Sequence, residues 1–306
     1  MRLLAIGCVW IGATAARADV TVFAEEPINL LGRITSSGHA AVYLDRVCAD
    51  RLTHLRLCRA GERGVVISRY TGIGGNDWLA VDVLAYLYAA DTPDAIPERV
   101  TREELVAMRA QYRERHAAEL PPGVVAGDAQ WRMLVGSAYR RRTVAVRLHT
   151  TPEEEERVMV WLNSSANRSH FNLFWHNCAD FAGAVVSVAM AQPVHRSYVA
   201  DAGIMTPKQV VHRMEEMDRR DSSLAMEAYV IPQVPGETRR SGRIYGVTEA
   251  FVRSKPYLLP LAVIQPIGIG SVVAAWMCDR RHWPATGTTG LPAELRFGRS
   301  DAAPGE

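Results

Sequence analysis

The sequence has almost no excess charge of either sign. Of its 306 residues, 35 are lysine or arginine and 33 are aspartate or glutamate, so the formal net charge is +2. Nucleic-acid binding needs a concentrated basic surface that neutralises phosphates, and we therefore expect no nucleic-acid partner. Hydrophobic residues make up 48% of the chain and charged residues 22%, which is typical of a folded globular protein and not of a disordered one.

The common cofactor and metal motifs are also missing. The segment TGIGGNDW at 71–78 is rich in glycine, but its glycine spacing matches neither a phosphate loop nor a dinucleotide-binding turn. His176 stands close to Cys178, Asp180 and His170. Catalytic zinc usually takes three protein ligands in a defined geometry, and a single histidine-x-cysteine offers no second spaced pair. We expect neither a cofactor nor a metal.

The first residues have the three-part layout of a secretory signal peptide. One arginine precedes an apolar run over residues 3–16, and the small-x-small triplet Ala-Arg-Ala ends at residue 18. A lipoprotein site at Cys8 is the alternative, but the residues before it fit a lipid-attachment motif poorly. We expect residues 1–18 to be removed and the mature protein, beginning at Asp19, to lie in the periplasm or cell envelope.

Cysteine is scarce, with five in the chain, and removal of the signal peptide leaves four. Cys48 and Cys58 enclose a short polar segment, and in an oxidising compartment they are natural partners for a local disulfide. The alternative is two unpaired buried thiols. If the pair forms, Cys178 remains a free thiol without a nearby partner.

The pattern of apolar and capping residues predicts a mixture of strands and helices. We expect strands at 36–44, 64–70 and 143–150, and helices at 101–119, from Pro152 and from Pro207. The two proline starts follow a threonine cap. Because the two element types do not alternate strictly, the pattern favours an α+β fold over a doubly wound sheet.

The C-terminal region contains a long uncharged segment. Residues 257–277 carry no charge and would span about 31 Å as one helix, which is enough to cross a bilayer core. We predict a transmembrane helix over 257–278, with a buried core segment as the alternative, since two prolines and two glycines disfavour a regular helix. Residues 236–256 would be a linker or domain extension, and 279–306 a disordered tail.

One cysteine has the setting of a nucleophile. In HNCADF, Asn177 is a good N-cap, which puts Cys178 at the first helical position. The positive end of the helix dipole favours the thiolate, and free backbone N–H groups there can stabilise an oxyanion. Asp180 opposes this effect, so a histidine partner is needed. His39 is the candidate because it follows Gly38 at the start of an apolar strand.

The stretches SSGHAAVYL at 36–44 and NCADFA at 177–182 resemble the circularly permuted papain-like fold, in which a strand histidine precedes the helix cysteine. That group includes lecithin:retinol acyltransferase-like proteins and permuted relatives of the NlpC-type cell-wall peptidases. The resemblance implies one domain over 19–235, with a small antiparallel sheet packed against helices and a helical insertion at about 71–140. It also implies that Cys178 is the nucleophile and His39 the general base.

The same resemblance calls for a third polar residue on the next strand, which would orient the imidazole. GVVISRY offers Ser68 where the family more often carries histidine, glutamate or asparagine. His54, inside the cysteine loop, is the other candidate. The sequence therefore predicts an exported thiol hydrolase or acyltransferase that acts on an amide or ester of a cell-wall peptide or a lipid. The alternative is a non-catalytic envelope protein that keeps this scaffold for binding or assembly.

Overall fold

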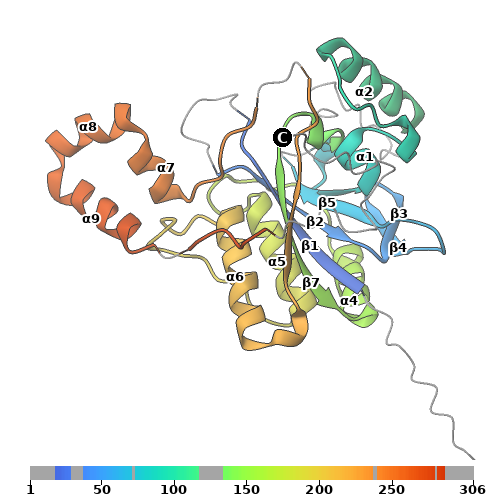
Figure 1. Cartoon of the computed structure of the whole chain (residues 1–306). Coiled ribbons are helices and arrows are strands. Elements are labelled where there is room, and N and C mark those ends of the chain that lie inside the picture. The colour runs from blue at the N-terminus through green and yellow to red at the C-terminus, as the bar shows by residue number, and fades with distance from the viewer. Residues whose placement is uncertain are drawn as a thin grey trace, which may run out of the picture.

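The computed structural model describes residues 18–28, 37–70, 73–116, 134–236, 240–279 and 281–286. A six-stranded antiparallel sheet forms its centre, in the order β6-β5-β2-β1-β7-β8 (Figure 1). Its strands are β1 (Ala18–Glu25), β2 (His39–Leu44), β5 (Val65–Arg69), β6 (Trp78–Asp82), β7 (Thr143–Thr150) and β8 (Glu227–Ile231). A separate two-stranded ribbon joins β3 (Val47–Arg51) to β4 (His54–Leu57).

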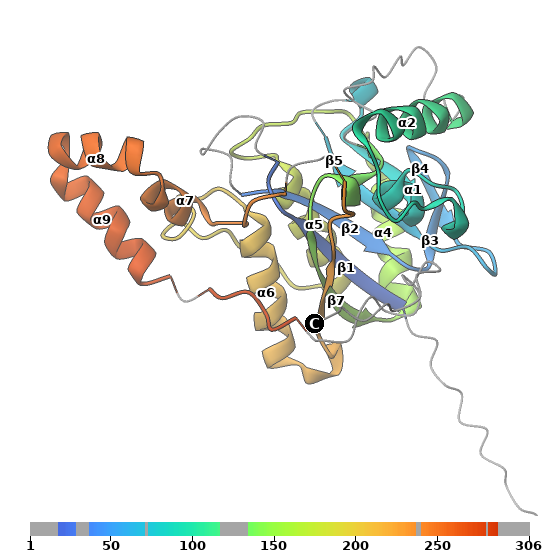
Figure 2. The same ribbon diagram turned by 45° about the horizontal axis from the view of Figure 1, so that its top comes forward.

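Helices cover both faces of this sheet, and the three C-terminal ones project away from it (Figures 1 and 2). In chain order, the helices are α1 (Val83–Tyr88), α2 (Arg102–His116), α4 (Pro152–Ser164), α5 (Cys178–Met190), α6 (Pro207–Arg220), α7 (Val247–Arg253), α8 (Lys255–Ile264) and α9 (Pro266–Met277), with short 3-10 turns at Ile73–Gly75, Pro93–Ala95, Ser137–Tyr139 and Ser222–Leu224. The predicted starts of α4 and α6 are confirmed. Thr151 and Glu154 form a reciprocal capping box, and the Thr206 hydroxyl accepts from the Gln209 N–H. The α+β fold class is confirmed as well.

The sheet separates two apolar cores. Along β1, Val20 and Val22 face the core that lies under α4, α5 and α6, whereas Phe23 faces the core under α1 and α2. Figures 1 and 2 show these helices on opposite sides of the strands. Because successive strand residues point to opposite faces, a strand covered on both sides is apolar almost throughout. Polar residues are therefore few on the central strands of the sheet.

Three strands of the central sheet were not predicted from the sequence, namely β1, β6 and β8. The range expected as a helical insertion, 71–140, supplies β6, which pairs with β5 at the edge of the sheet, as well as α1 and α2. Residues 117–133 of that range lie outside the described residues. β6 reads as a continuous apolar run, and such runs do not distinguish a buried strand from a buried helix.

The predicted transmembrane helix at 257–278 is wrong. The chain forms two shorter helices, α8 and α9, which meet at Gln265 (φ −134°) just before Pro266. Proline lacks the N–H that would continue the helix and disfavours helical geometry in the residue before it. None of the helices in the described part of the chain is both long and apolar enough to span a membrane.

The predicted disulfide is confirmed. Cys48 and Cys58 are bonded and join β3 to the residue that follows β4. Residues 1–17 of the predicted signal peptide, 1–18, and the alternative site at Cys8 lie outside the described residues. Ala18, the last residue of the predicted signal, is described: it is the first residue of β1, is buried, and lies opposite Thr150 of β7. Most of the expected disordered tail, from residue 287 onward, also lies outside the described residues.

Candidate active site

Cys178 is the first residue of α5. The Asn177 carboxamide oxygen accepts from the N–H groups of Ala179 (2.8 Å) and Asp180 (3.0 Å), and the Asn177 N–H donates to the Asp180 carboxylate (3.0 Å). The Asn177 side-chain amide also donates to the Met205 carbonyl oxygen (3.0 Å). This buried asparagine therefore holds the start of α5 against the chain before α6, which fixes the position of the thiol.

His39 is the first residue of β2, directly after a tight turn at Gly38. Gly38 has φ +77°, and a Cβ there would lie 2.1 Å from the Glu25 carbonyl oxygen. Only glycine fits both this left-handed conformation and this close approach. The turn brings His39 opposite Glu25 in the β1–β2 register.

The structure places Ser68 next to His39. The Ser68 hydroxyl oxygen lies 3.0 Å from His39 Nε2 and 2.8 Å from the Ala40 carbonyl oxygen. The carbonyl can only accept, so the single hydroxyl proton points to Ala40, and His39 Nε2 must carry the proton of the other bond. The neutral imidazole is then the Nε2–H tautomer, which leaves Nδ1 as the nitrogen free to take a proton.

The surroundings of Cys178 favour its thiolate. Burial raises the pKa of the Cys178 thiol, but the charge and hydrogen bonding of His39, the Ala40 N–H and the charge of Arg141 together lower it more, so that the net pKa is below that of an ordinary cysteine. This is the combination expected of a nucleophile with an imidazole partner.

Asp180 does not oppose this effect as directly as the sequence implies. Its carboxylate forms an ion pair with the Arg196 guanidinium. The negative charge that follows Cys178 by two residues is therefore matched by a positive one. Burial nevertheless raises the pKa of Asp180 above its usual value, against the lowering by Asn177 and Arg196.

The other sequence candidates lie elsewhere. His54 is exposed in the β3–β4 ribbon and its Nδ1 bonds the Asp50 carboxylate (2.9 Å), so Ser68, and not His54, contacts His39. His176 is exposed and its ring packs against His170, 4.6 Å between centroids. Within the described residues, the one grouping with metal-ligand spacing contains both disulfide sulfurs, and His176 does not belong to it.

A buried polar cluster next to the site was missed from the sequence. Glu25 is 2% exposed and forms an ion pair with Arg141 (3.0 Å) and accepts from the Tyr86 hydroxyl (2.8 Å). The Tyr70 ring lies 5.6 Å from the His39 ring, and burial together with the Glu25 charge raises the Tyr70 pKa. The sequence signal for this cluster was Glu25 at the end of an apolar strand. Its partner Arg141 is 116 residues away in sequence, so the pair could not be recognised from the sequence.

The loop before Cys178 presents apolar side chains to solvent. Phe174 and Trp175 are each about half exposed, and their carbonyl oxygens accept from Arg196 at 2.9 Å and 2.8 Å. The Arg196 guanidinium also lies over the Trp175 ring, 5.2 Å from its centroid. One arginine thus holds an exposed aromatic surface in the loop that leads into Cys178, where it can contact an apolar part of a substrate.

We expect Ser68→Ala to lower the rate of Cys178 alkylation at pH 7 by roughly five- to tenfold, because a lost hydrogen bond of about 1 kcal/mol leaves His39 less well oriented. Iodoacetamide kinetics across pH measure this effect. Ser187→Ala is the matched control, since Ser187 also makes two hydrogen bonds, farther along α5. Equal rates in both variants would remove Ser68 from the site.

Comparisons with known proteins add little to this description. No family model and no curated protein matches the chain. Among solved structures, it is similar to a type VI secretion system effector, TseH, with a TM-score of 0.25 and 18% sequence identity, over 57% of this chain and 76% of that one. A likeness at this level carries no argument about function, which must come from the residues themselves.

Proposed function

We propose that this protein is a cysteine-dependent hydrolase or acyltransferase that acts on an amide or ester carbonyl, on a permuted papain-like scaffold. The observation that carries the proposal is the Cys178 thiol at a helix start, with its pKa lowered by His39 while Ser68 holds the imidazole. The order of a strand histidine before a helix cysteine supports the permuted arrangement. The disulfide supports a location in an oxidising compartment outside the cytoplasm.

The chemistry follows from the atoms in place. His39 Nδ1 takes the thiol proton, and the Cys178 sulfur attacks the carbonyl carbon to form a tetrahedral oxyanion. Collapse breaks the bond to the leaving amine or alcohol, which receives the proton from His39, and leaves a thioester on Cys178. Water or another acceptor then attacks the thioester carbonyl while His39 removes its proton. Collapse breaks the carbon–sulfur bond and releases the acid or the acylated acceptor, and the sulfur takes the proton back from His39, which restores the thiol.

The oxyanion donor can be narrowed to one backbone group on α5. The N–H groups of Ala179 and Asp180 are bonded to the Asn177 carboxamide, and the Phe181 N–H bonds the Asn177 carbonyl oxygen. The Cys178 N–H has no acceptor among the described residues. It therefore remains free to stabilise the oxyanion, as the helix dipole also favours.

The test is to incubate the protein in parallel with cell-wall peptides and with phospholipids. We expect product from one of these classes, a thioester adduct on Cys178 in the mass spectrum, and a loss of at least about 10³-fold in rate for Cys178→Ala. An unchanged rate in Cys178→Ala would refute a cysteine mechanism. Alkylation of Cys178 with the pH profile of an ordinary thiol would instead support a non-catalytic envelope protein.

A further inference from the structure

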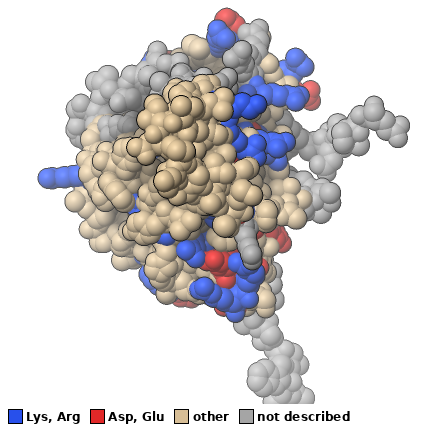
Figure 3. Space-filling view, turned by 90° about the vertical axis from the view of Figure 1, so that its left-hand side faces the viewer, with Lys and Arg blue, Asp and Glu red and all other residues tan. Residues whose placement is uncertain are grey.

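The helices α7, α8 and α9 form an arm that projects from the body of the protein (Figures 1 and 2). After Lys255, the α8–α9 hairpin contains no charged residue up to its end at Met277. Many of its large side chains are exposed, and Val263 and Ile267, on either side of the bend, are each 84% exposed. Figure 3 shows the result as a broad uncharged surface with lysine and arginine side chains beside it.

This hairpin differs from an ordinary surface helix pair. A surface helix in water normally carries a polar stripe opposite its apolar one, and a helix that is apolar all round is normally covered. Burial of apolar surface is favourable by about 25 cal/mol for each Å² that is removed from water, so covering these side chains would be favourable. The described part of the chain leaves these side chains exposed to water.

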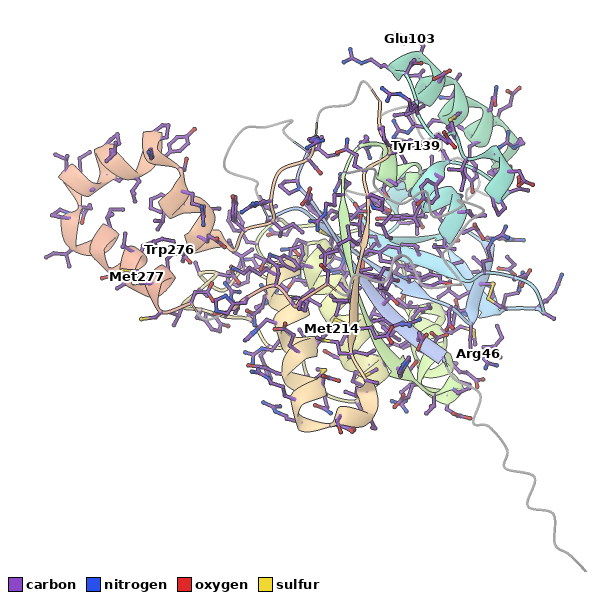
Figure 4. The ribbon with its side chains drawn as sticks, viewed as in Figure 1. Arg46, Glu103, Tyr139, Met214, Trp276 and Met277 are labelled. Carbon is purple, nitrogen blue, oxygen red and sulfur yellow. A yellow bond between two sulfur atoms is a disulfide. The ribbon has the colours of Figure 1, made fainter. Side chains whose placement is uncertain are left out.

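The order of residue types along the hairpin fits a lipid bilayer. Aliphatic side chains surround the bend at Gln265, whereas the aromatic Tyr257 and Trp276 lie at the opposite end of the hairpin, and Figure 4 shows Trp276 near the end of α9. The exposed Lys255 and Arg253 follow at the base of the arm. A bilayer has the same order: its hydrocarbon favours aliphatic residues, its interface favours tyrosine and tryptophan, and its anionic headgroups favour lysine and arginine.

The length of the hairpin defines how deep it can reach. Helices of 10 and 12 residues measure about 15–18 Å, close to half of the ~30 Å hydrocarbon thickness. A hairpin of this length enters one leaflet and returns on the same side, which differs from a spanning helix.

The arm is also firmly attached. The Asp201 carboxylate accepts from the Val247 N–H (2.7 Å) at the start of α7 and forms an ion pair with Arg281, which follows α9. Both ends of the arm are thus held by one buried side chain. The same segment carries Tyr198, which lies against Gly203 close to the Trp175 ring, next to the candidate active site.

We propose that the α8–α9 hairpin inserts into the hydrocarbon of one leaflet of an anionic bilayer and holds the protein at the membrane surface. Lys255 contacts acidic headgroups at the base of the hairpin, together with Arg253, whose guanidinium also pairs with Glu249 (3.2 Å). The proposal does not depend on the activity of Cys178.

Flotation with vesicles of phosphatidylglycerol and phosphatidylethanolamine tests the proposal. We expect the full-length protein to float with these vesicles, and V263D combined with I267D to reduce the bound fraction at least tenfold. Val160→Asp, on the exposed face of α4, is the matched control and should not change binding. Cys178→Ala should bind as well as the unmodified protein, which separates this proposal from the catalytic one.

Three outcomes would overturn it. Equal flotation of the double variant would show that the hairpin is not the contact, and failure of the unmodified protein to float would show that lipid is not the partner. If light scattering then shows a dimer that the double variant abolishes, the hairpin is covered by a second copy of the chain. Circular dichroism of the double variant checks that it is folded.

A second inference concerns two acidic residues close to the start of β1, namely Asp45, which follows β2, and Glu155, which lies on α4. Glu155 is completely buried, and its Oε1 has no hydrogen-bond partner, while its Oε2 accepts from the Arg46 N–H (3.0 Å). Asp45 lies beside it, and burial raises the pKa of both carboxyl groups. The two carboxyl groups share a side-chain hydrogen bond. In the described part of the chain, no lysine or arginine side chain bonds either of them, so the pair has no cation in hydrogen-bond contact.

The geometry points to the α-ammonium group of the mature chain as that cation. The backbone nitrogen of Asp19 lies 3.0 Å from Asp45 Oδ1, and Asp19 is held in β1, where its own carboxylate bonds Arg147 (3.2 Å). Hydrolysis of the Ala18–Asp19 bond by water converts this nitrogen from an amide to an ammonium at the same place. The predicted export signal would thus end where a buried acidic site receives the new terminus.

A thermodynamic cycle tests this second proposal. The protein is released from a cleavable N-terminal fusion so that it begins at Asp19 or at Ala18, each with and without Glu155→Gln. We expect the Asp19 start to raise Tm by about 3 °C relative to the Ala18 start, and this difference to disappear with Glu155→Gln. The same difference in both backgrounds, or an exported protein whose N-terminal sequence begins elsewhere than Asp19, would refute the site.

Discussion

His39→Ala is expected to lower the rate of iodoacetamide alkylation of Cys178 at pH 6.5 by roughly 10- to 100-fold. An ordinary thiol, with a pKa of about 8.5, is only about 1% ionised at that pH. His39 is the largest of the influences that lower the Cys178 pKa, whereas burial raises it. Without the imidazole the burial effect remains, so the thiolate should appear only at higher pH.

The measurement is the alkylation rate as a function of pH, with the adduct located by mass spectrometry. The unmodified protein should keep its reactivity well below pH 8, and the variant should regain it only as the pH rises above that range. His54→Ala is the matched control, since His54 is exposed and bonds Asp50. A variant profile that overlays that of the unmodified protein would show that His39 does not act on the thiol.

Gly38→Ala is expected to destabilise the fold by at least about 3 kcal/mol, which combines the cost of left-handed backbone with that of overpacking. Gly38 has φ +77°, and the new Cβ would lie 2.1 Å from the Glu25 carbonyl oxygen, a backbone atom that cannot rotate away. Thermal unfolding should show a Tm lower by roughly 6–12 °C. Because residue 38 is adjacent to His39, the change should also shift the imidazole, and we expect the folded protein to show a lower rate of Cys178 alkylation.

Gly61→Ala separates the two contributions. Gly61 has a similar φ of +87°, but a Cβ there meets no atom within 4 Å. We expect it to cost about 1 kcal/mol, the backbone contribution alone. If the two variants unfold at the same temperature, the close approach of Gly38 to β1 does not limit stability.

Local patterns were sufficient for part of this protein. The caps of α4, α5 and α6 are formed by side chains within three residues of the backbone groups they bond, so the sequence identifies them directly. The disulfide joins cysteines that are only ten residues apart, so the short segment between them brings the two thiols together without a long-range contact. Strands with a turn signal, such as β2 and β5, were likewise found within a few residues of their observed bounds.

Other features depend on residues that are distant in sequence. The strands β1 and β8 flank β7 in the sheet, and their pairing comes from long-range register and not from local propensity. The transmembrane prediction failed because it gave the uncharged length more weight than the prolines, and Pro266 divides the segment into α8 and α9. Glu25 and Arg141 could be recognised as partners only once β1 and β7 were paired.

By itself, the sequence determined that Cys178 begins a helix and that His39 begins a strand, because capping and turn chemistry act over a few residues. It left open whether Ser68 or His54 follows in the site. Only the tertiary structure decided this, since the β2–β5 pairing brings the Ser68 hydroxyl within 3.0 Å of His39 while the β3–β4 ribbon carries His54 to Asp50. Strand register selects which side chains meet, and register is a property of the whole sheet.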